Sequence, residues 1–194
     1  PKTSVEIYCQ DLPPASLQFL PLSDRVGRRS DVLKQEGVLI CVFDAGDLRY
    51  AGLEAALTPE EIQQHTIIDI DHHTSNTYFG DLNLVDLSAS STCEVVYFLL
   101  KEMNLPITKA TATCLLTGLI TDTGAFTNLA TTPGSLHVAG ELLRAGASVA
   151  KIARLTIQRQ NISRLRLWGL ALSRLHRHPE TKVVTTSLTI QDFK

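Results

Sequence analysis

Apolar residues along this chain fall into two kinds of run, whose spacing predicts an alternating order of strands and helices. Short apolar runs that barely alternate with polar residues predict buried strands near residues 4–9, 38–43, 65–70 and 83–87. Longer runs with helical spacing predict helices near residues 92–103, 107–121, 133–145, 149–157 and 161–176. Apolar strands separated by helices favour a mostly parallel sheet covered on both faces. The pattern therefore predicts an α/β fold.

Two helix starts are marked by capping residues. Ser91-Thr92-Cys93-Glu94 has the form of a capping box, in which the serine accepts from the N–H three residues on and the glutamate reaches back. Thr132-Pro133 places a cap before a proline at the first helical position, and Gly146 is expected to end that helix. Although helix N-termini also attract phosphate, we interpret these residues as structural.

The composition is typical of a soluble domain. With 44% hydrophobic residues among 194, one core of ordinary size can form, so one domain plus a fragment of another is expected. No apolar run reaches the roughly 18–20 residues of a membrane span, and no signal-peptide pattern opens the sequence. Four cysteines lie in apolar segments without zinc-type spacing, which predicts buried reduced thiols and a cytoplasmic protein. These are Cys9, Cys41, Cys93 and Cys114.

Charge is divided unevenly along the chain. Residues 1–150 carry a net charge of −9, whereas residues 151–194 carry +7. Seven Lys or Arg residues and no Asp or Glu lie between Lys151 and His178. An acidic part that binds a divalent metal beside a basic segment that holds phosphates is one interpretation, with Arg159 and Arg164 as candidate phosphate-binding residues. A solvated basic helix face is the alternative, and the charge pattern does not decide between them.

Three consecutive ionisable residues, Asp71-His72-His73, follow a predicted apolar strand. They stand where open α/β sheets bind ligands, at the carboxyl end of a strand. Asp44 ends another predicted strand, and Asp122 ends a predicted helix. If the strands are parallel neighbours, Asp44 and His72 emerge at one edge of the sheet, and Asp122 joins them if its helix ends over that edge. A polar loop with a satisfied histidine is the alternative to a metal-centred hydrolytic site.

The segments around these residues resemble three signature motifs of the DHH phosphoesterases, which are manganese-dependent hydrolases of phosphate esters and anhydrides. The three segments are residues 43–48, 68–76 and 118–124. Within the family, the bacterial nanoRNase/pAp phosphatases are the most similar branch, and residues 128–147 resemble that branch too. The resemblance covers most of residues 4–190 and implies a parallel sheet with helices on both faces, the fold of a DHH domain.

The resemblance also implies a division of the chain. Residues 1–157 correspond to the DHH domain without its first strand and that strand's His-x-x-x-Asp-x-Asp-type motif, which holds much of the first metal. Residues 158–180 correspond to a linker helix, and residues 181–194 to the start of a small C-terminal DHHA1-like domain. In the family the first strand lies inside the sheet. Without it, we expect the strand near 38–43 to present unpaired backbone groups and apolar Val38, Ile40 and Val42, so that either an outside strand fills the gap or the chain self-associates.

Each candidate residue acquires a role from the resemblance. Asp44 resembles the carboxylate that bridges two metal ions, and His72 and Asp122 resemble ligands of the second ion. His73 resembles the residue that contacts the scissile phosphate as charge stabiliser or proton donor, and Asp71 fits a role in orienting an imidazole. Two Mn²⁺ ions roughly 3.5–4 Å apart would activate a water for attack on phosphorus, with Mg²⁺, Co²⁺ or Zn²⁺ as substitutes.

The implied function is hydrolysis of short single-stranded oligonucleotides or small nucleotide phosphates such as pAp. Related activities remain open, namely hydrolysis of cyclic dinucleotides, pyrophosphate or short polyphosphate. From a different class, a degenerate nucleotide-binding module without catalysis is also compatible with the sequence, and the chain as given is expected to be inactive. A homodimer is left open, and no membrane partner is expected.

Overall fold

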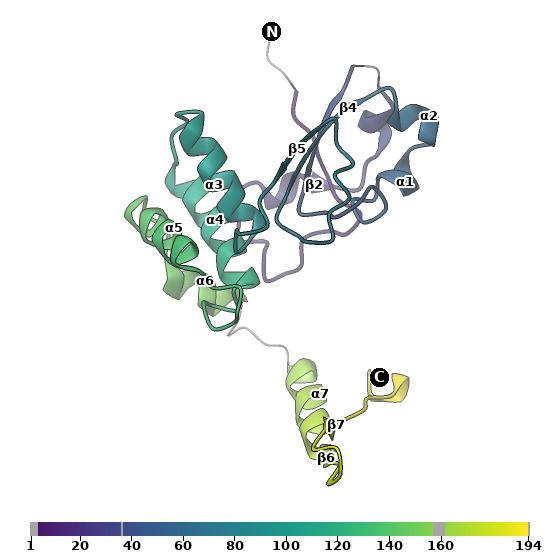
Figure 1. Cartoon of the computed structure of the whole chain (residues 1–194), viewed down its shortest axis with the longest axis vertical. Coiled ribbons are helices and arrows are strands. Elements are labelled where there is room, and N and C mark those ends of the chain that lie inside the picture. The colour runs from purple at the N-terminus through teal and green to yellow at the C-terminus, as the bar shows by residue number, and fades with distance from the viewer. Residues whose placement is uncertain (1–3, 36, 157–161, 194) are drawn as a thin grey trace. The chain divides into compact units, whose positions relative to one another are not determined.

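The computed structural model describes residues 4–35, 37–156 and 162–193. It divides the chain into two compact units, residues 1–156 and residues 157–194, which are described separately. The first unit combines a parallel sheet with a group of helices, and the second is a helix followed by a small hairpin (Figure 1).

The sheet that carries the candidate residues has three parallel strands in the order β3-β4-β5. The strands are β3 (Leu39–Phe43), β4 (Thr66–Asp71) and β5 (Leu82–Val85). A second parallel pair, β1 (Ile7–Tyr8) with β2 (Val26–Gly27), forms outside this sheet. Two short helices, α1 (Leu53–Ala56) and α2 (Pro59–Ile62), connect β3 to β4. Parallel neighbours place the carboxyl ends of β3 and β4 at one edge, as expected.

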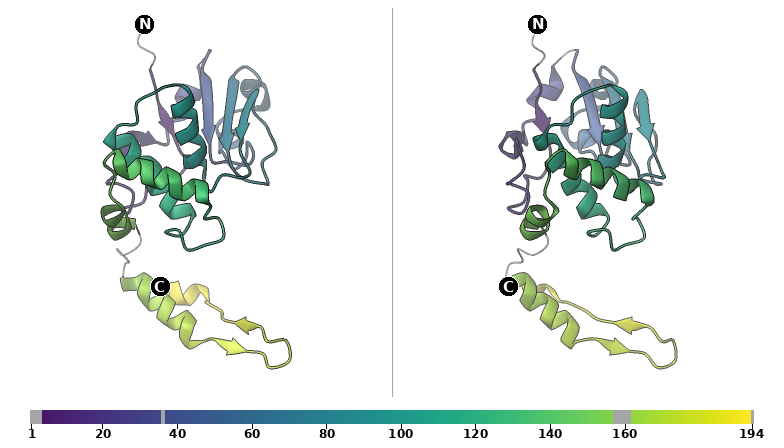
Figure 2. Two further views of the ribbon diagram at one scale, coloured as in Figure 1. Left: turned by 60° about the vertical axis from the view of Figure 1, so that its left-hand side comes forward. Right: turned by 90° about the vertical axis from the view of Figure 1, so that its left-hand side faces the viewer.

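Four helices lie on the other side of the sheet from α1 and α2 (Figures 1 and 2). They are α3 (Thr92–Glu102), α4 (Lys109–Asp122), α5 (Pro133–Arg144) and α6 (Val149–Thr156). Their apolar faces form one core that includes the fully buried Leu116, Leu119 and Leu142. A second core joins the sheet to α1, with Val42 and Ile67 packed near Leu53. These layers confirm the α/β prediction.

The predicted helix starts are largely confirmed. The side chain of Ser91 accepts from the N–H of Glu94, while the Glu94 carboxylate accepts from the N–H of Ser90, one residue before the cap. At α5, Thr132 and Ser135 form a capping box with Pro133 inside the first turn. Gly146 follows the helix with a φ of 98°, a conformation that glycine adopts without strain.

Burial along β3 differs from the prediction. Ile40 and Val42 are buried in the sheet core, whereas Leu39, Cys41 and Phe43 are exposed. The expectation that Ile40 and Val42 would be the uncovered side chains is therefore wrong. The reason is that only one face of β3 is packed: Ile40 and Val42 belong to the core that joins the sheet to α1, and the residues that alternate with them lie on the other face. All four cysteines are free, but Cys9 and Cys41 are exposed rather than buried.

The second unit contains α7 (Ile162–Ser173) and an antiparallel pair, β6 (His176–Arg177) with β7 (Val184–Thr185). Arg174, just after α7, forms a bidentate ion pair with Asp192 near the end of the chain. None of the unit's described residues is buried. Its assignment as a linker helix plus the start of a DHHA1-like domain stays a prediction. No described helix in either unit has the length and apolar character to cross a membrane.

Candidate metal centre

The carboxyl ends of β3 and β4 bring Asp44 and His72 together. Asp44 follows Phe43, and its N–H donates to the carbonyl of Ile70 on β4, which ties the two strand ends. Asp44 has a φ of 63°, an uncommon conformation for a residue with a side chain. One carboxylate oxygen of Asp44, Oδ1, lies 3.7 Å from Nε2 of His72. The sequence expectation that these two residues share one edge is met.

Asp122 reaches the same histidine from a different element. It is the last residue of α4, and its Oδ2 lies 3.9 Å from Nε2 of His72. Asn128 donates to the backbone carbonyl of Asp122, and the buried Thr123 turns the chain immediately after it. Burial raises the pKa of Asp122, and the nearby negative charge of Asp44 raises it further. The carboxylates of Asp44 and Asp122 therefore both lie close to Nε2 of His72.

The orientation of His72 leaves that nitrogen free to act as a ligand. Its Nδ1 is 3.2 Å from the carbonyl oxygen of Ala89, which can only accept, so Nδ1 carries the hydrogen of this bond. In the neutral ring Nε2 is then the nitrogen with the lone pair. A histidine held in this way by a backbone carbonyl is typical of a metal ligand. Two carboxylates and this nitrogen make a donor set that fits a divalent cation, and the repulsion between the carboxylates favours one.

His73 points its ring toward the same region but is held differently. Its Nδ1 is 2.7 Å from Oδ1 of Asp71, and this hydrogen bond raises the pKa of His73. The bond leaves only Nε2–H of His73 for another partner. Ligand atoms of Asp44, His72 and His73 all lie within 4.8 Å of one another. This group contains His73 and not Asp122, which approaches Nε2 of His72 from the other element.

Asp71 is fully buried, and its carboxylate accepts three hydrogen bonds. Its carboxylate accepts from the N–H of His72, from Nδ1 of His73 and from Nδ2 of Asn76, each at 2.7 Å. Burial alone would raise the pKa of Asp71, but these hydrogen bonds outweigh it and lower the pKa. The role of Asn76 was not predicted, because an asparagine five residues after Asp71 carries no sequence signal of this contact.

Asp69 lies on the same face of β4 as Asp71 but lacks such partners. It is fully buried, and neither of its carboxylate oxygens has a hydrogen-bond partner among the described residues. Burial raises the pKa of the Asp69 carboxyl, and the nearby Asn76 amide, which donates to Asp71 instead, offsets that rise only in part. Asp47 stabilises a turn, because its Oδ1 accepts from the N–H of Tyr50.

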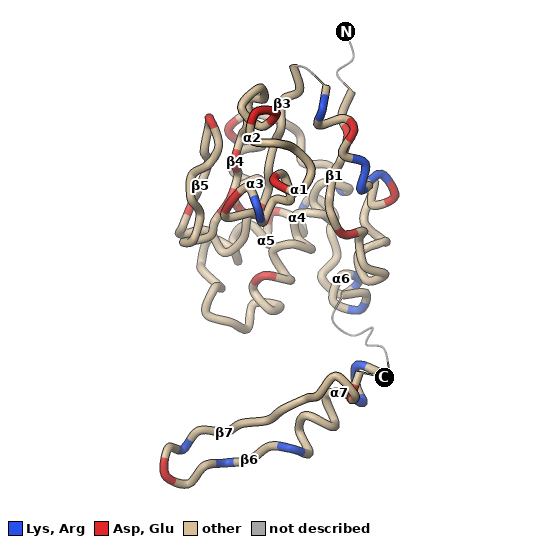
Figure 3. The backbone as a smooth tube through the Cα atoms, turned by 90° about the vertical axis from the view of Figure 1, so that its right-hand side faces the viewer, with Lys and Arg blue, Asp and Glu red and all other residues tan. Residues whose placement is uncertain are grey.

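The structure does not test the two arginines predicted to bind phosphate. Arg159 lies outside the described residues, and Arg164 is an exposed residue of α7 in the second unit. Figure 3 shows acidic residues spread over the first unit and basic ones recurring through the second. A phosphate-binding role for either arginine stays a prediction.

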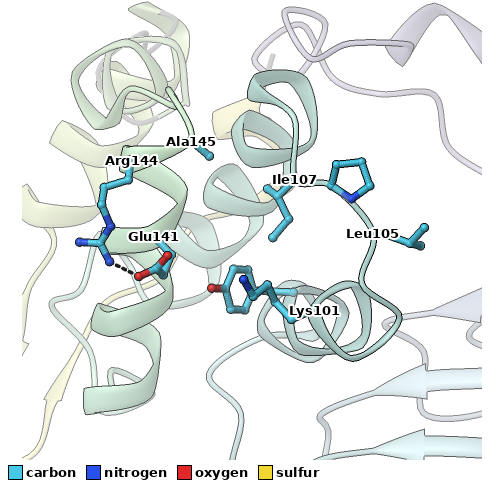
Figure 4. A pocket seen from close by; sticks show the side chains of 8 residues that line it. Lys101, Leu105, Ile107, Glu141, Arg144 and Ala145 are labelled. Carbon is cyan, nitrogen blue, oxygen red and sulfur yellow. Dashed lines mark hydrogen bonds and ion pairs between the residues drawn. The ribbon is translucent and has the colours of Figure 1, made fainter.

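A surface pocket of about 400 Å³ lies at the other end of the helices, between α3 and α5 (Figure 4). Its polar rim includes Lys101 and an ion pair between Arg144 and Glu141. Lys101 lies nine residues beyond Thr92 on α3, which separates the pocket from the metal-ligand residues by roughly 13 Å of helix. The pocket is therefore not the candidate metal centre.

Comparisons with known proteins agree with these motifs. The family model described as "DHH family, N-terminal domain" matches residues 4–119. The Thermus thermophilus protein named "Bifunctional oligoribonuclease and PAP phosphatase NrnA" is 35% identical over 183 residues, which are 94% of this chain and 54% of that protein. The Bacillus subtilis protein of the same name is 33% identical, over 71% of this chain and 42% of that protein. The chain thus spans about half the length of the curated relatives it matches.

Solved structures show the same fold. An exopolyphosphatase-related protein from Bacteroides fragilis has a TM-score of 0.85 and 26% sequence identity, covering 96% of this chain and 57% of that one. A putative family II inorganic pyrophosphatase from Methanococcus jannaschii has a TM-score of 0.51 at 18% identity, covering 77% of this chain and 51% of the other. The second similarity concerns the fold alone.

Proposed function

The chain belongs to the DHH family, and from this premise we propose that it forms the metal-binding part of a phosphoesterase acting on short oligonucleotides or small nucleotide phosphates such as pAp. The observation that carries the proposal is the convergence of Asp44 and Asp122 on the free ring nitrogen of His72. A degenerate module would have no need to keep two repelling carboxylates around one imidazole.

Asp44, His72 and Asp122 would hold the ion, with Mn²⁺ as the proposed metal and Mg²⁺, Co²⁺ or Zn²⁺ as substitutes. Carboxylate oxygens mixed with imidazole nitrogen suit a divalent ion of this borderline-hard class. When bound, the metal supplies charge neutralisation at phosphorus and a water of lowered pKa. The hydrogen bond from Nδ1–H of His72 to the Ala89 carbonyl would hold the ring so that Nε2 could act as the ligand.

His73, oriented by Asp71, would stabilise the negative charge of the substrate's phosphate. Asp71 would orient the ring of His73 through their hydrogen bond, which also raises the pKa of His73 and so favours its protonated form. The remaining Nε2–H can donate to a phosphate oxygen or to the leaving oxygen as the ester bond breaks. Asn76 holds Asp71 from the other side and so fixes the pair. In this arrangement Asp71 acts through His73 and does not itself reach the phosphate.

The metal assignment is tested by calorimetry with Mn²⁺ on the purified chain. Asp44→Ala, His72→Ala and Asp122→Ala should each lose measurable binding, because each removes one of three ligands. Asp47→Ala, which changes a carboxylate that serves only a turn, is the matched control and should bind like wild type. Undiminished binding in all three ligand variants would remove the assignment.

The substrate class is supported by the names of the Thermus and Bacillus relatives, which mention oligoribonuclease and PAP phosphatase activity. The test assays the protein at its natural length, with Mn²⁺, against pAp, a linear dinucleotide, a cyclic dinucleotide, pyrophosphate and short polyphosphate. Turnover of pAp and the linear dinucleotide is expected.

A second candidate is hydrolysis of phosphoanhydrides, such as pyrophosphate or short polyphosphate. It is favoured by the name of the structurally similar exopolyphosphatase-related protein. Turnover of pyrophosphate or polyphosphate with no action on pAp or dinucleotides would establish this candidate instead.

A further inference from the structure

Asp44 is poorly constrained by its own segment. Its side chain is about half exposed, at 52%, and it stands in a loop after an edge strand. A carboxylate in such a position can rotate away from His72. Among the described residues, one side chain hydrogen-bonds to it: the hydroxyl of Thr92 donates to Oδ1 of Asp44 at 2.7 Å.

Thr92 is well placed to fix that carboxylate. It is 5% exposed and is the first residue of α3, directly after the fully buried cap Ser91. The cap is locked by Glu94, whose N–H donates to Ser91 and whose carboxylate accepts from Ser90. Since α3 packs against both β4 and α4, its first turn is anchored to the two elements that carry His72 and Asp122. A β-branched side chain also has few rotamers, which holds the hydroxyl in place.

We infer that Thr92 is a positioning residue of the metal centre, which holds Asp44 in the rotamer that faces His72. The inference rests on the proposed function, because it assumes that Asp44 is a metal ligand. The oxygen that accepts from Thr92 is the one that lies 3.7 Å from Nε2 of His72 and 3.9 Å from Nδ1 of His73. The hydrogen bond occupies part of that oxygen's acceptor capacity and leaves the rest of the carboxylate directed into the site.

A purely structural role for Thr92 is the competing explanation. A threonine at the start of a helix can be retained for packing, and its hydroxyl can satisfy itself locally. Here the bond instead crosses 48 residues of sequence to another element. The two explanations differ in one measurable quantity, the metal affinity of the folded protein.

The test measures Mn²⁺ affinity by calorimetry for Thr92→Val, which keeps the shape and removes the donor, and for Thr92→Ser, which keeps the donor. The expected result is a loss of about 10-fold or more for the valine variant and recovery to near wild type in the serine variant, as is typical of residues that orient a metal ligand. Thr117→Val is the matched control: Thr117 is 2% exposed, and its hydroxyl donates only to the Thr113 carbonyl.

Unfolding temperature without metal is measured in parallel, so that loss of fold is separated from loss of affinity. If the valine variant does not fold, the pair Thr92→Ala and Thr92→Ser gives the same comparison. Wild-type affinity in a folded Thr92→Val protein, or equal weakening in the valine and serine variants, would overturn the inference. Failure of wild type itself to bind Mn²⁺ would overturn the proposed function, and the role of Thr92 with it.

Discussion

At the scale of single residues, two aspartates on one face of β4 illustrate how partners decide the effect of a buried charge. Asp71 and Asp69 are both fully buried, yet Asp71 accepts three hydrogen bonds and Asp69 none that the described residues supply. Since an unsatisfied buried polar group costs about 1–3 kcal/mol, Asp69→Val should raise the free energy of unfolding by about that amount. Asp71→Val should lower it. Urea unfolding at pH 7 measures both, and a destabilised Asp69→Val protein would contradict the assignment.

The same pair predicts opposite responses to pH. The pKa of Asp69 is raised above its unfolded value of 3.8, so its cost is complete above the folded pKa and disappears as the pH falls toward 3.8. The advantage of Asp69→Val over wild type should therefore shrink on acidification. The pKa of Asp71 is lowered, so its stabilisation is complete above 3.8 and is lost as the pH falls below that value. Unfolding free energies of the metal-free proteins between pH 3 and pH 8 give both profiles.

At the scale of elements, the seam between α3 and α4 depends on a glycine. A Cβ added at Gly118 of α4 would lie 2.2 Å from Sγ of Cys93 on α3, so that either the Cys93 side chain must rotate or the helices must separate. Gly118→Ala should cost about 1–3 kcal/mol of stability and weaken Mn²⁺ binding, because Asp122 and Thr92 sit on either side of this seam. Gly140→Ala on α5 meets nothing within 4 Å and should be neutral or slightly stabilising.

A double variant distinguishes the steric effect of Gly118→Ala at the α3–α4 contact from its effect on helix propensity. Cys93→Ala removes the sulfur that the new methyl group meets, so it should recover part of the stability lost in Gly118→Ala. Thermal unfolding of wild type, the two single variants and the double variant forms a double-mutant cycle, which gives the coupling energy between positions 93 and 118. Additive effects would show that Gly118 is not needed for the α3–α4 contact.

The edge of the sheet makes a second prediction about elements. β3 pairs only with β4 among the described residues and exposes Leu39 and Phe43 by more than half. Because an open apolar strand edge is a template for pairing, the purified chain should self-associate unless another strand covers it. Leu39→Lys should shift sedimentation toward monomer. Leu136→Lys, on the equally exposed Leu136 of α5, is the control and should leave association unchanged.

At the scale of the whole molecule, the described site offers ligands for one ion. Asp44 and Asp122 lie 3.7 Å and 3.9 Å from Nε2 of His72, and Asp44, His72 and His73 form the one group of mutually close ligand atoms among the described residues. A two-metal mechanism needs a second set of ligands. The chain by itself should therefore bind Mn²⁺ with modest affinity and turn over pAp at or near background. Robust Mn²⁺-dependent turnover by the purified 194-residue chain would mean that the second ion has ligands not identified here.

Several features of this protein could be predicted from local patterns in its sequence. The strands ending near Asp44 and Asp71, and the helices beginning at Thr92 and Pro133, follow from apolar spacing and capping residues, which act over a few neighbouring positions. The position of Asp44 and His72 at one edge of the sheet could also be predicted, because neighbouring parallel strands end on the same side. In contrast, the two short helices α1 and α2 and the strand β2 were not predicted, since two to four residues are too few to show a period.

What only the tertiary structure decided are the contacts between distant segments. The hydroxyl of Thr92 meets Asp44 across 48 residues, and the end of α4 places Asp122 beside His72 across 50. Neither contact follows from spacing, because each depends on how helices dock on the sheet. The exposure of Cys41 has the same origin: an apolar strand is buried on both faces only where other elements pack on both, and the docking of helices on the sheet decides that. The sequence determines the chemical groups and local elements, and packing determines which of those groups meet.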